Sequence, residues 1–165
     1  MIPELVGSFD RSLAFMRGLI ADLSDEEMVL QPPGAPNHAA WTIGHVIHSC
    51  QAIAGELGVV PWLPGDWDAR FGYGSAPAAA ADSGGCRKAA LLAALADAAE
   101  RLRAVLLATD ESRLRDPLPD EKTREILPTL GDALLQVVSA HTAFHAGQLA
   151  VWRRAIGRLP VGVFV

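Results

Sequence analysis

Apolar residues recur at three- and four-residue steps in four stretches of the chain, which is the spacing of an amphipathic helix with one buried face. The predicted helices cover about residues 2–23, 37–57, 86–108 and 129–156. Ala and Leu dominate these stretches, whereas β-branched and aromatic runs of strand length are scarce. The pattern therefore predicts an all-α protein.

Local signals mark where these helices begin and end. Ser24 followed by Glu27 predicts a capping box that opens a short helical turn after the first helix. Asn37 is the predicted cap of the second helix. Gly58 and Gly157 are predicted to stop the second and the last helix, because glycine readily adopts the left-handed conformation found just after helix ends.

Two connectors separate the predicted helices. Residues 59–85 are rich in Pro, Gly and aromatic residues, and residues 110–128 form a polar connector. A loop as long as the first is usually functional or disordered. With 165 residues and no internal repeat, the chain is expected to form a single domain, residues 1–165, folded as an up-down four-helix bundle with a long loop between helices 2 and 3.

Composition and charge limit which classes of partner and which cellular location are expected. The formal net charge of −5 and the pI near 5.4 leave no basic face for a phosphate backbone, so nucleic acid is not an expected partner. The first residues lack the charged and apolar regions of a signal peptide, and no apolar run approaches membrane-spanning length. A cytoplasmic protein that acts on a small molecule, with no membrane partner, is expected.

The cysteines and the apolar tail allow two interpretations each. The spacing of Cys50 and Cys86 matches neither a disulfide framework nor a thiolate zinc site. Both are interpreted as buried small residues, with a redox-responsive pair as the alternative. Residues 159–165 are apolar, which predicts either a homodimer or a tail that folds back.

The last predicted helix carries two histidines on a stripe that is otherwise mostly apolar. The members of this stripe are Leu134, Val138, His141, His145, Gln148 and Trp152. An inward-facing imidazole costs free energy unless it is hydrogen-bonded or coordinated, so these histidines need a partner. Histidines at positions i and i+4 place two ring nitrogens one above the other, which suits chelation of one metal ion.

A third histidine ligand is expected from the second helix. His45 lies beside residues predicted to face the core, and helical bundles build metal sites from facing helices. His48 is the alternative ligand, or an outer partner that fixes an imidazole tautomer. His38, in the approach to the helix, is interpreted as a surface or capping residue. Three imidazoles would leave positions open for water or substrate, as in catalytic zinc sites.

Two segments of the sequence resemble the DinB-like superfamily. They are residues 37–45, Asn-His-Ala-Ala-Trp-Thr-Ile-Gly-His, and residues 141–148, His-Thr-Ala-Phe-His-Ala-Gly-Gln. The resemblance implies a four-helix bundle with a metal, often nickel or zinc, held by His45, His141 and His145. It also implies a relation to transferases and isomerases that use a low-molecular-weight thiol, and it does not imply DNA binding.

The leading functional hypothesis is a metal-dependent enzyme in which Zn²⁺ or Ni²⁺ activates a bound water or thiol. Transfer of a low-molecular-weight thiol fits the resemblance best, and hydrolysis of a small substrate comes next. The second hypothesis is a non-catalytic metal- or ligand-binding stress-response protein. The third is that the three histidines are ordinary core residues without a metal. The sequence singles out no catalytic base.

The long loop and the last helix hold further candidates. Gln148 is expected to hydrogen-bond a ligand histidine or a metal-bound water, or to pack between helices with a solvated amide. Gly147 is expected to permit a close approach of another helix. Four aromatic residues of the loop are expected either to form an apolar lid over the metal or to pack on the flank of the bundle or at a subunit interface: Trp62, Trp67, Phe71 and Tyr73.

Overall fold

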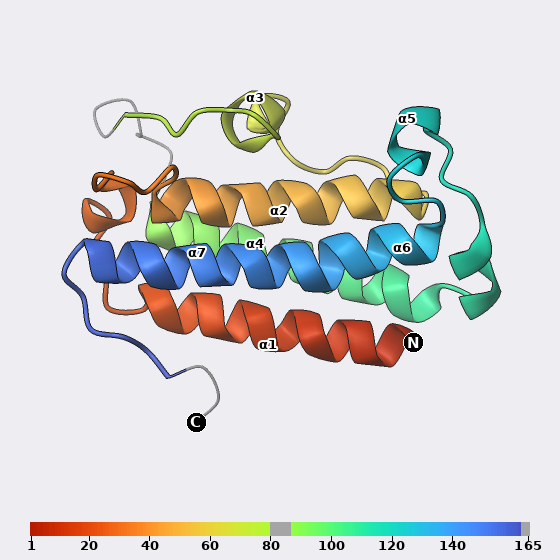
Figure 1. Ribbon diagram of the computed structural model, residues 1–165, viewed down its shortest axis with the longest axis horizontal. Helices are drawn as coiled ribbons and strands as arrows, with labels where there is room; N and C mark the ends of the chain where they lie inside the picture. Colours follow the sequence, from red (N-terminus) through yellow and green to blue (C-terminus); the bar gives the residue numbers. More distant parts are fainter. Residues whose placement is uncertain (80–86, 163–165) are drawn as a thin grey trace.

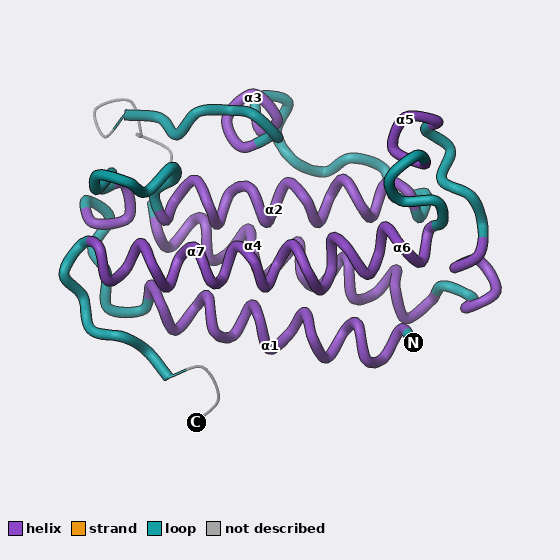
Figure 2. Tube along the Cα trace, viewed as in Figure 1, coloured by secondary structure: helices purple, strands orange, loops and turns teal. Residues whose placement is uncertain are grey.

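The structure, a computed structural model, describes residues 1–79 and 87–162. Within these ranges the regular elements are helices, apart from one isolated β-bridge between Pro117 and Thr129, so the expected all-α class is confirmed. Four long helical segments dominate the described part (Figures 1 and 2). They are α1 (Ile2–Ile20), α2 (Ala39–Glu56), α4 (Lys88–Ala108) and a continuous last segment of α6 (Leu130–Leu134), η4 (Leu135–His141) and α7 (Thr142–Ala155).

Short helices lie in the connectors between these segments. The long segments begin and end within a few residues of the predicted bounds. In Figure 1, α3 lies over α2, in the middle of the long predicted loop. No described helix is long and apolar enough to cross a membrane. The short helices are η1 (Glu27–Val29), α3 (Trp67–Phe71), η3 (Glu111–Arg115) and α5 (Glu121–Arg124).

Contacts between α1 and the last segment fix their relative direction. Ser8 hydrogen-bonds Ser139 of η4 with an Oγ–Oγ distance of 2.9 Å. Asp22, just beyond the other end of α1, pairs with Arg153 near the end of α7 at 2.6 Å. In both contacts the partner lies 131 residues later in the sequence. Moving along α1 therefore means moving the same way along the last segment, so the two run parallel.

The remaining two long helices run in the opposite direction. Lys88, at the start of α4, donates its backbone N–H to Asp25 at 2.7 Å, whereas Arg103 near the end of α4 donates to Asp10 of α1 at 2.6 Å. α4 is therefore antiparallel to α1, and Figure 1 shows α2 and α4 running in the same direction. Here the structure differs from the strict alternation expected of an up-down order.

The long connector explains this difference. α2 has 18 residues and is therefore about 27 Å long. The chain between α2 and α4, residues 57–87, is long enough to return over the length of α2 before α4 begins. A short turn would instead have forced the two helices to be antiparallel neighbours.

The core lies between the four long segments and is built from their apolar faces. Burial of apolar surface is the main favourable contribution to folding, so these faces hold the segments together. The polar side chains that face the same interior need partners of their own. The largest fully buried side chains are Phe9, Leu13, Met16, Leu19, Ile20, Met28, Ile43, Ile47, Leu95, Leu102, Leu106 and Leu134.

Arg153 connects α7 to the end of α1 through an ion pair and hydrogen bonds. It is only 4% exposed, and its guanidinium donates to both carboxylate oxygens of Asp22 at 2.6 and 2.9 Å. The same side chain donates to the carbonyl oxygens of Leu19 and Leu159. The hydrogen bond from Arg153 is the main reason why the pKa of Asp22 falls to about 2. Four of the five guanidinium N–H groups of Arg153 therefore have an acceptor, which offsets the cost of burying the charge.

The predicted helix boundaries at Ser24, Gly58 and Gly157 are confirmed. Ser24 donates its N–H to Glu27 Oε2 at 2.9 Å, and Glu27 returns its N–H to Ser24 Oγ at 3.2 Å, which is the capping box that precedes η1. Gly58 and Gly157 follow α2 and α7 with φ of +90° and +81°. Left-handed φ values of this kind favour glycine after a helix end.

Candidate metal centre

Three histidine side chains meet between α2 and the last helical segment. His141 lies between the other two, with its Nε2 atom 3.1 Å from Nε2 of His45 and 3.0 Å from Nε2 of His145. One nitrogen from each ring lies within 4.8 Å of the others. His45 and His145 are each 6% exposed, and His141 is half-buried. The structure thus brings together the three histidines singled out in the sequence.

The His45 ring is oriented by contacts with two residues. Its Nδ1 lies 2.7 Å from the carbonyl oxygen of Phe71, and because a carbonyl can only accept, Nδ1 carries the proton. This leaves the lone pair of Nε2 facing the other two histidines. Trp41 stacks on the ring with a centroid separation of 4.7 Å and an angle of 9° between the planes. The Phe71 carbonyl therefore selects the tautomer that a ligand bound through Nε2 requires.

Gly44 lets α3 approach α2 closely enough for this contact. A Cβ atom on Gly44 would lie 2.3 Å from the Phe71 ring, which is closer than side chains tolerate. Trp67 of α3 also donates its indole N–H to the Gly44 carbonyl at 3.1 Å. The glycine that precedes His45 thus has a packing role. Sequence reasoning missed the Phe71 carbonyl, because a main-chain acceptor leaves no signal in residue type.

A π-helical turn, η4, precedes His145 and ends at His141. Thr142 donates its hydroxyl to the carbonyl of Val137, five residues earlier, at 3.0 Å. The sequence predicts an uninterrupted α-helix here, so the π turn is a difference from that prediction. Such turns inside α-helices are frequent at functional sites. An extra residue in the turn rotates the rest of the helix about its axis, and this rotation sets the direction in which the two histidines project.

The buried setting keeps the three histidines neutral. Desolvation, together with the neighbouring histidines, lowers the pKa of His141 and of His145 to about 4. Desolvation also lowers the pKa of His45, although the hydrogen bond to Phe71 opposes this effect. Neutral imidazole is the form that binds a metal ion, so the site presents the correct form at neutral pH.

The donor set fits a divalent metal ion. Imidazole nitrogens suit zinc, nickel and copper. With metal–nitrogen bonds of about 2.0–2.1 Å, two neighbouring ligand nitrogens lie about 2.9–3.4 Å apart for bond angles of about 90–110°, a range that includes the 3.0 and 3.1 Å separations here. Hydrogen bonds between the rings satisfy this cluster poorly. Nε2 of His141 carries at most one proton, so it can donate to only one of the two neighbouring Nε2 atoms. A cation between the nitrogens removes that conflict.

Gln148 lies beside the cluster, one helical turn beyond His145. Nδ1 of His145, Nδ1 of His141 and Oε1 of Gln148 are all buried, and none of them makes a hydrogen bond within the described residues. The Gln148 amide lies near enough to His145 to raise its pKa, as the smallest of the effects on this group, without meeting hydrogen-bond geometry. The solvated-amide interpretation is therefore wrong for the amide oxygen of Gln148.

His48 lies outside the cluster. Its Nε2 contacts Asp68 Oδ1 at 2.9 Å, and its ring lies nearly parallel to that of His45 with centroids 6.3 Å apart. The group of potential metal ligands contains His45 in its place. Of the two alternatives on the second helix, the structure brings His45 to the histidines of the last segment.

His38, not Asn37, caps α2. Its Nδ1 accepts a hydrogen bond from the Trp41 N–H at 3.0 Å, and its Nε2 donates to the Ala78 carbonyl at 3.1 Å. His38 is 2% exposed, so its capping interpretation is confirmed and its surface interpretation is wrong. An imidazole can accept at one nitrogen and donate at the other. That capacity ties the long connector to the start of α2, which a shorter Asn side chain does not do.

The aromatic residues of the long connector pack on the flank of the helices rather than over the histidines. Phe71 is 3% exposed and lies against Gly44, and the Trp62 ring lies beneath the guanidinium of Arg101 at 5.4 Å. Tyr73 is 99% exposed, so it neither covers the histidines nor packs on the flank of the helices, and its place at a subunit interface stays a prediction. The connector reaches the histidine cluster through the Phe71 carbonyl and not through an aromatic ring.

Cys50 is a buried thiol on α2. Burial raises its pKa to about 12, so its interpretation as a small buried residue is confirmed. Cys86 lies outside the described residues, and so do residues 163–165 of the predicted apolar tail. The redox pair and the full tail therefore stay predictions.

The family comparison covers the same residues as this site. The model for the DinB superfamily matches residues 8–149, which include most of α1, all of α2 and α4, and the three clustered histidines. The chain belongs to the DinB superfamily. The resemblance seen in residues 37–45 and 141–148 is thereby confirmed.

One solved structure shares the fold of this DinB superfamily member. It is the crystal structure of a conserved protein from Enterococcus faecalis, with a TM-score of 0.76 and 19% sequence identity over 96% of this chain and 98% of that chain. A likeness at this identity shows a common fold and says nothing of the reaction. Among curated proteins, none matches the sequence at a significant level.

Proposed function

We propose that the four long segments form a four-helix bundle that binds one divalent metal ion, Zn²⁺ or Ni²⁺, through Nε2 of His45, His141 and His145. The observation that carries this proposal is the convergence of three neutral imidazoles, with nitrogens 3.0 and 3.1 Å apart. Ordinary core histidines would each find a hydrogen-bond partner, whereas Nδ1 of two of these rings has none among the described residues.

The proposed activity is that of a metal-dependent enzyme acting on a small molecule. When bound, such a metal lowers the pKa of a coordinated water or thiol, so that a nucleophile forms near neutral pH. Transfer of a low-molecular-weight thiol is the preferred reaction, and hydrolysis of a small substrate is the second choice. His45 is held in the required tautomer by Phe71, and Trp41 shields one face of its ring from water.

Access to the cluster supports a small-molecule substrate. Two of the three histidines are buried, and His141 is the one that is half-buried. Three protein ligands leave coordination positions free for water, thiol or substrate. The exposed edge of His141 marks the side from which a small molecule would approach.

Metal content tests the proposed site. Protein purified without an immobilised-metal column is expected to hold about one metal ion per chain by elemental analysis. Replacing both His141→Ala and His145→Ala is expected to remove it. His48→Ala is the matched control, because His48 is also a histidine of α2 but contacts Asp68. A double variant that keeps the metal, or a control that loses it, contradicts the proposed ligand set.

A second experiment separates the enzyme from a non-catalytic binding protein. Thermal unfolding is measured for metal-loaded and chelator-treated protein with a panel of small thiols. A thiol that binds at the metal is expected to raise the midpoint of the loaded protein only, because it stabilises the native state in proportion to its occupancy. Loaded protein that responds to no thiol and hydrolyses no small ester or amide is instead a metal-binding protein without this activity.

A further inference from the structure

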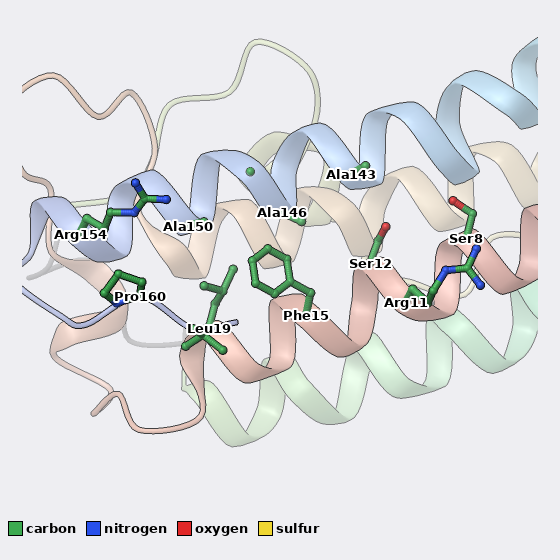
Figure 3. A pocket seen from close by; sticks show the side chains of 12 residues that line it. Ser8, Arg11, Ser12, Phe15, Leu19, Ala143, Ala146, Ala150, Arg154 and Pro160 are labelled. Carbon is green, nitrogen blue, oxygen red and sulfur yellow. The ribbon is translucent and has the colours of Figure 1, made fainter. Parts of the chain in front are cut away.

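A groove of about 470 Å³ runs along the side of α7 that faces away from the histidines (Figure 3). It lies between α1, α7 and the chain that follows α7. A Cβ atom on Gly147 would meet nothing within 4 Å, so this glycine widens the groove, and the close helix approach expected from the sequence is wrong. The volume is that of a small-molecule site. The α7 wall is made of small residues: Ala143, Ala146, Gly147 and Ala150.

The ends of this groove differ in chemistry from its middle. Arg11 and Ser12 of α1 line one end, together with Ser8. Figure 3 shows the Phe15 ring in the middle and Arg154 beside Pro160 at the opposite end. One end therefore offers a guanidinium and hydroxyl groups, whereas the middle is apolar.

The charges of Arg11 and Arg154 in the groove are not balanced by a nearby carboxylate among the described residues. Arg11 and Arg154 form no ion pair with the described residues, although the chain carries a net charge of −5. Their neighbour Arg153 shows the contrast, since it is paired with Asp22. Two unpaired guanidinium groups beside an apolar surface complement a ligand that is both anionic and apolar.

The geometry sets the shape of that ligand. Ser8 lies level with Ser139, so Arg11 lies level with about residue 142 of the last segment. Arg154 is then about 18 Å further along the groove. An elongated ligand with its charged group at Arg11 follows the groove across the apolar middle. The hydroxyl of Ser12 makes no hydrogen bond within the described residues and is free to donate beside Arg11.

We propose that this groove binds an elongated amphipathic anion of the medium-chain fatty-acid class. The carboxylate head accepts hydrogen bonds from Arg11 and Ser12, because a guanidinium matches a carboxylate with two parallel donors. The apolar body crosses Phe15 along the small residues of α7 towards Leu19 and Val161. The site lies on the far side of α7 from His141 and His145, so it is independent of the proposed metal function.

Calorimetric titration with decanoate tests this proposal. One decanoate per chain is expected to bind, and decan-1-ol is expected to bind more weakly, because it lacks the charge. Arg11→Gln is expected to weaken decanoate binding about tenfold, the loss of one charge-assisted hydrogen-bond pair. Gly147→Leu, which fills the groove, is expected to abolish binding. An unchanged far-ultraviolet circular dichroism spectrum and thermal unfolding midpoint show that the Gly147→Leu variant is folded.

Two further arginines provide matched controls. Arg17→Gln removes another exposed cation of α1 that does not line the groove, and it is expected to leave the affinity unchanged. Arg154→Gln is expected to change the affinity by less than about twofold, because its backbone lies about 18 Å along the groove from that of Arg11, further than the Debye length of about 8 Å. Equal losses in the Arg11, Arg17 and Arg154 variants would show non-specific attraction and overturn the site.

The same experiments distinguish two other occupants of the groove from a fatty acid. If decanoate does not bind and Gly147→Leu converts a dimer into a monomer by light scattering, the groove is a contact between two copies of the chain. If decanoate binds only after residues 163–165 are removed, the groove is covered by the chain itself. Either result overturns the fatty-acid proposal, and neither changes the expected result of the metal analysis.

Discussion

The two helical segments that supply the histidine cluster hold their rings in different ways. On α2, Nδ1 of His45 donates to the Phe71 carbonyl at 2.7 Å, and Trp41 stacks on the ring. On the last segment, Nδ1 of His141 and Nδ1 of His145 are buried without a hydrogen bond among the described residues. The fold thus preorganises the α2 half, whereas packing alone positions the other half. Contacts that hold His45 should therefore matter most for metal affinity.

The largest expected effect comes from Gly44→Ala. The new Cβ atom would lie 2.3 Å from the Phe71 ring, so α3 must move away and the Phe71 carbonyl must leave His45. Loss of such an outer partner weakens metal binding by about 10- to 100-fold. Overpacking of this kind also costs about 1–3 kcal/mol of stability. Competition with a chromophoric chelator measures the affinity, and thermal unfolding measures the stability.

Gly55→Ala is the matched control for this change. Gly55 lies in the same helix, and a Cβ atom there would meet nothing within 4 Å. Alanine is the better helix former by about 1 kcal/mol, so this variant is expected to be at least as stable as the parent. Metal affinity that falls equally in both variants would show that the α3 contact does not preorganise His45.

A smaller effect on metal affinity is expected from Gln148→Ala. This variant tests the half of the histidine cluster that lies on the last segment and is less constrained. The Gln148 amide lies near His145, and its oxygen is buried without a hydrogen bond among the described residues. If metal binding draws this oxygen into a hydrogen bond with His145, the variant should lose about tenfold in metal affinity. Gln136→Ala, an exposed glutamine of η4, should not change it. Equal affinities in the two variants would mean that Gln148 only fills space.

The chelator-treated protein is expected to lose stability in acid. His141 and His145 have a folded-state pKa of about 4, below their ordinary value of 6.5. As pH falls from about 6.5 towards 4, the unfolded chain takes up protons on these residues and the folded chain does not, so stability is lost across that window. The unfolding midpoint should fall by on the order of ten degrees more than in the His141→Ala, His145→Ala variant.

Side-chain pattern was sufficient to predict the helices and most of the site. His141 and His145 follow from their positions on one stripe of the last helix, because a spacing of four residues fixes a shared face. His45 depended on the resemblance to a family, since His48 on the same helix is equally polar. The structure distinguishes them through Asp68, which contacts His48 from the neighbouring connector.

The parts that sequence did not predict depend on the main chain and on tertiary contacts. The Phe71 carbonyl and the π turn at η4 are backbone features with no residue signature. The parallel course of α2 and α4 depends on how the long connector returns, which apolar spacing does not encode. His38 replaced Asn37 as the cap because it also reaches the Ala78 carbonyl, a partner forty residues away in sequence.

X-ray absorption at the metal edge tests the central claim most directly, because it counts the nitrogen ligands on the ion. Protein as purified is expected to show three imidazole ligands at about 2.0–2.1 Å, with the remaining positions taken by oxygen or by an added thiol sulfur. His45→Ala is expected to show two. A wild-type spectrum with two imidazoles or fewer, or a His45→Ala spectrum identical to it, would contradict a site built from His45, His141 and His145.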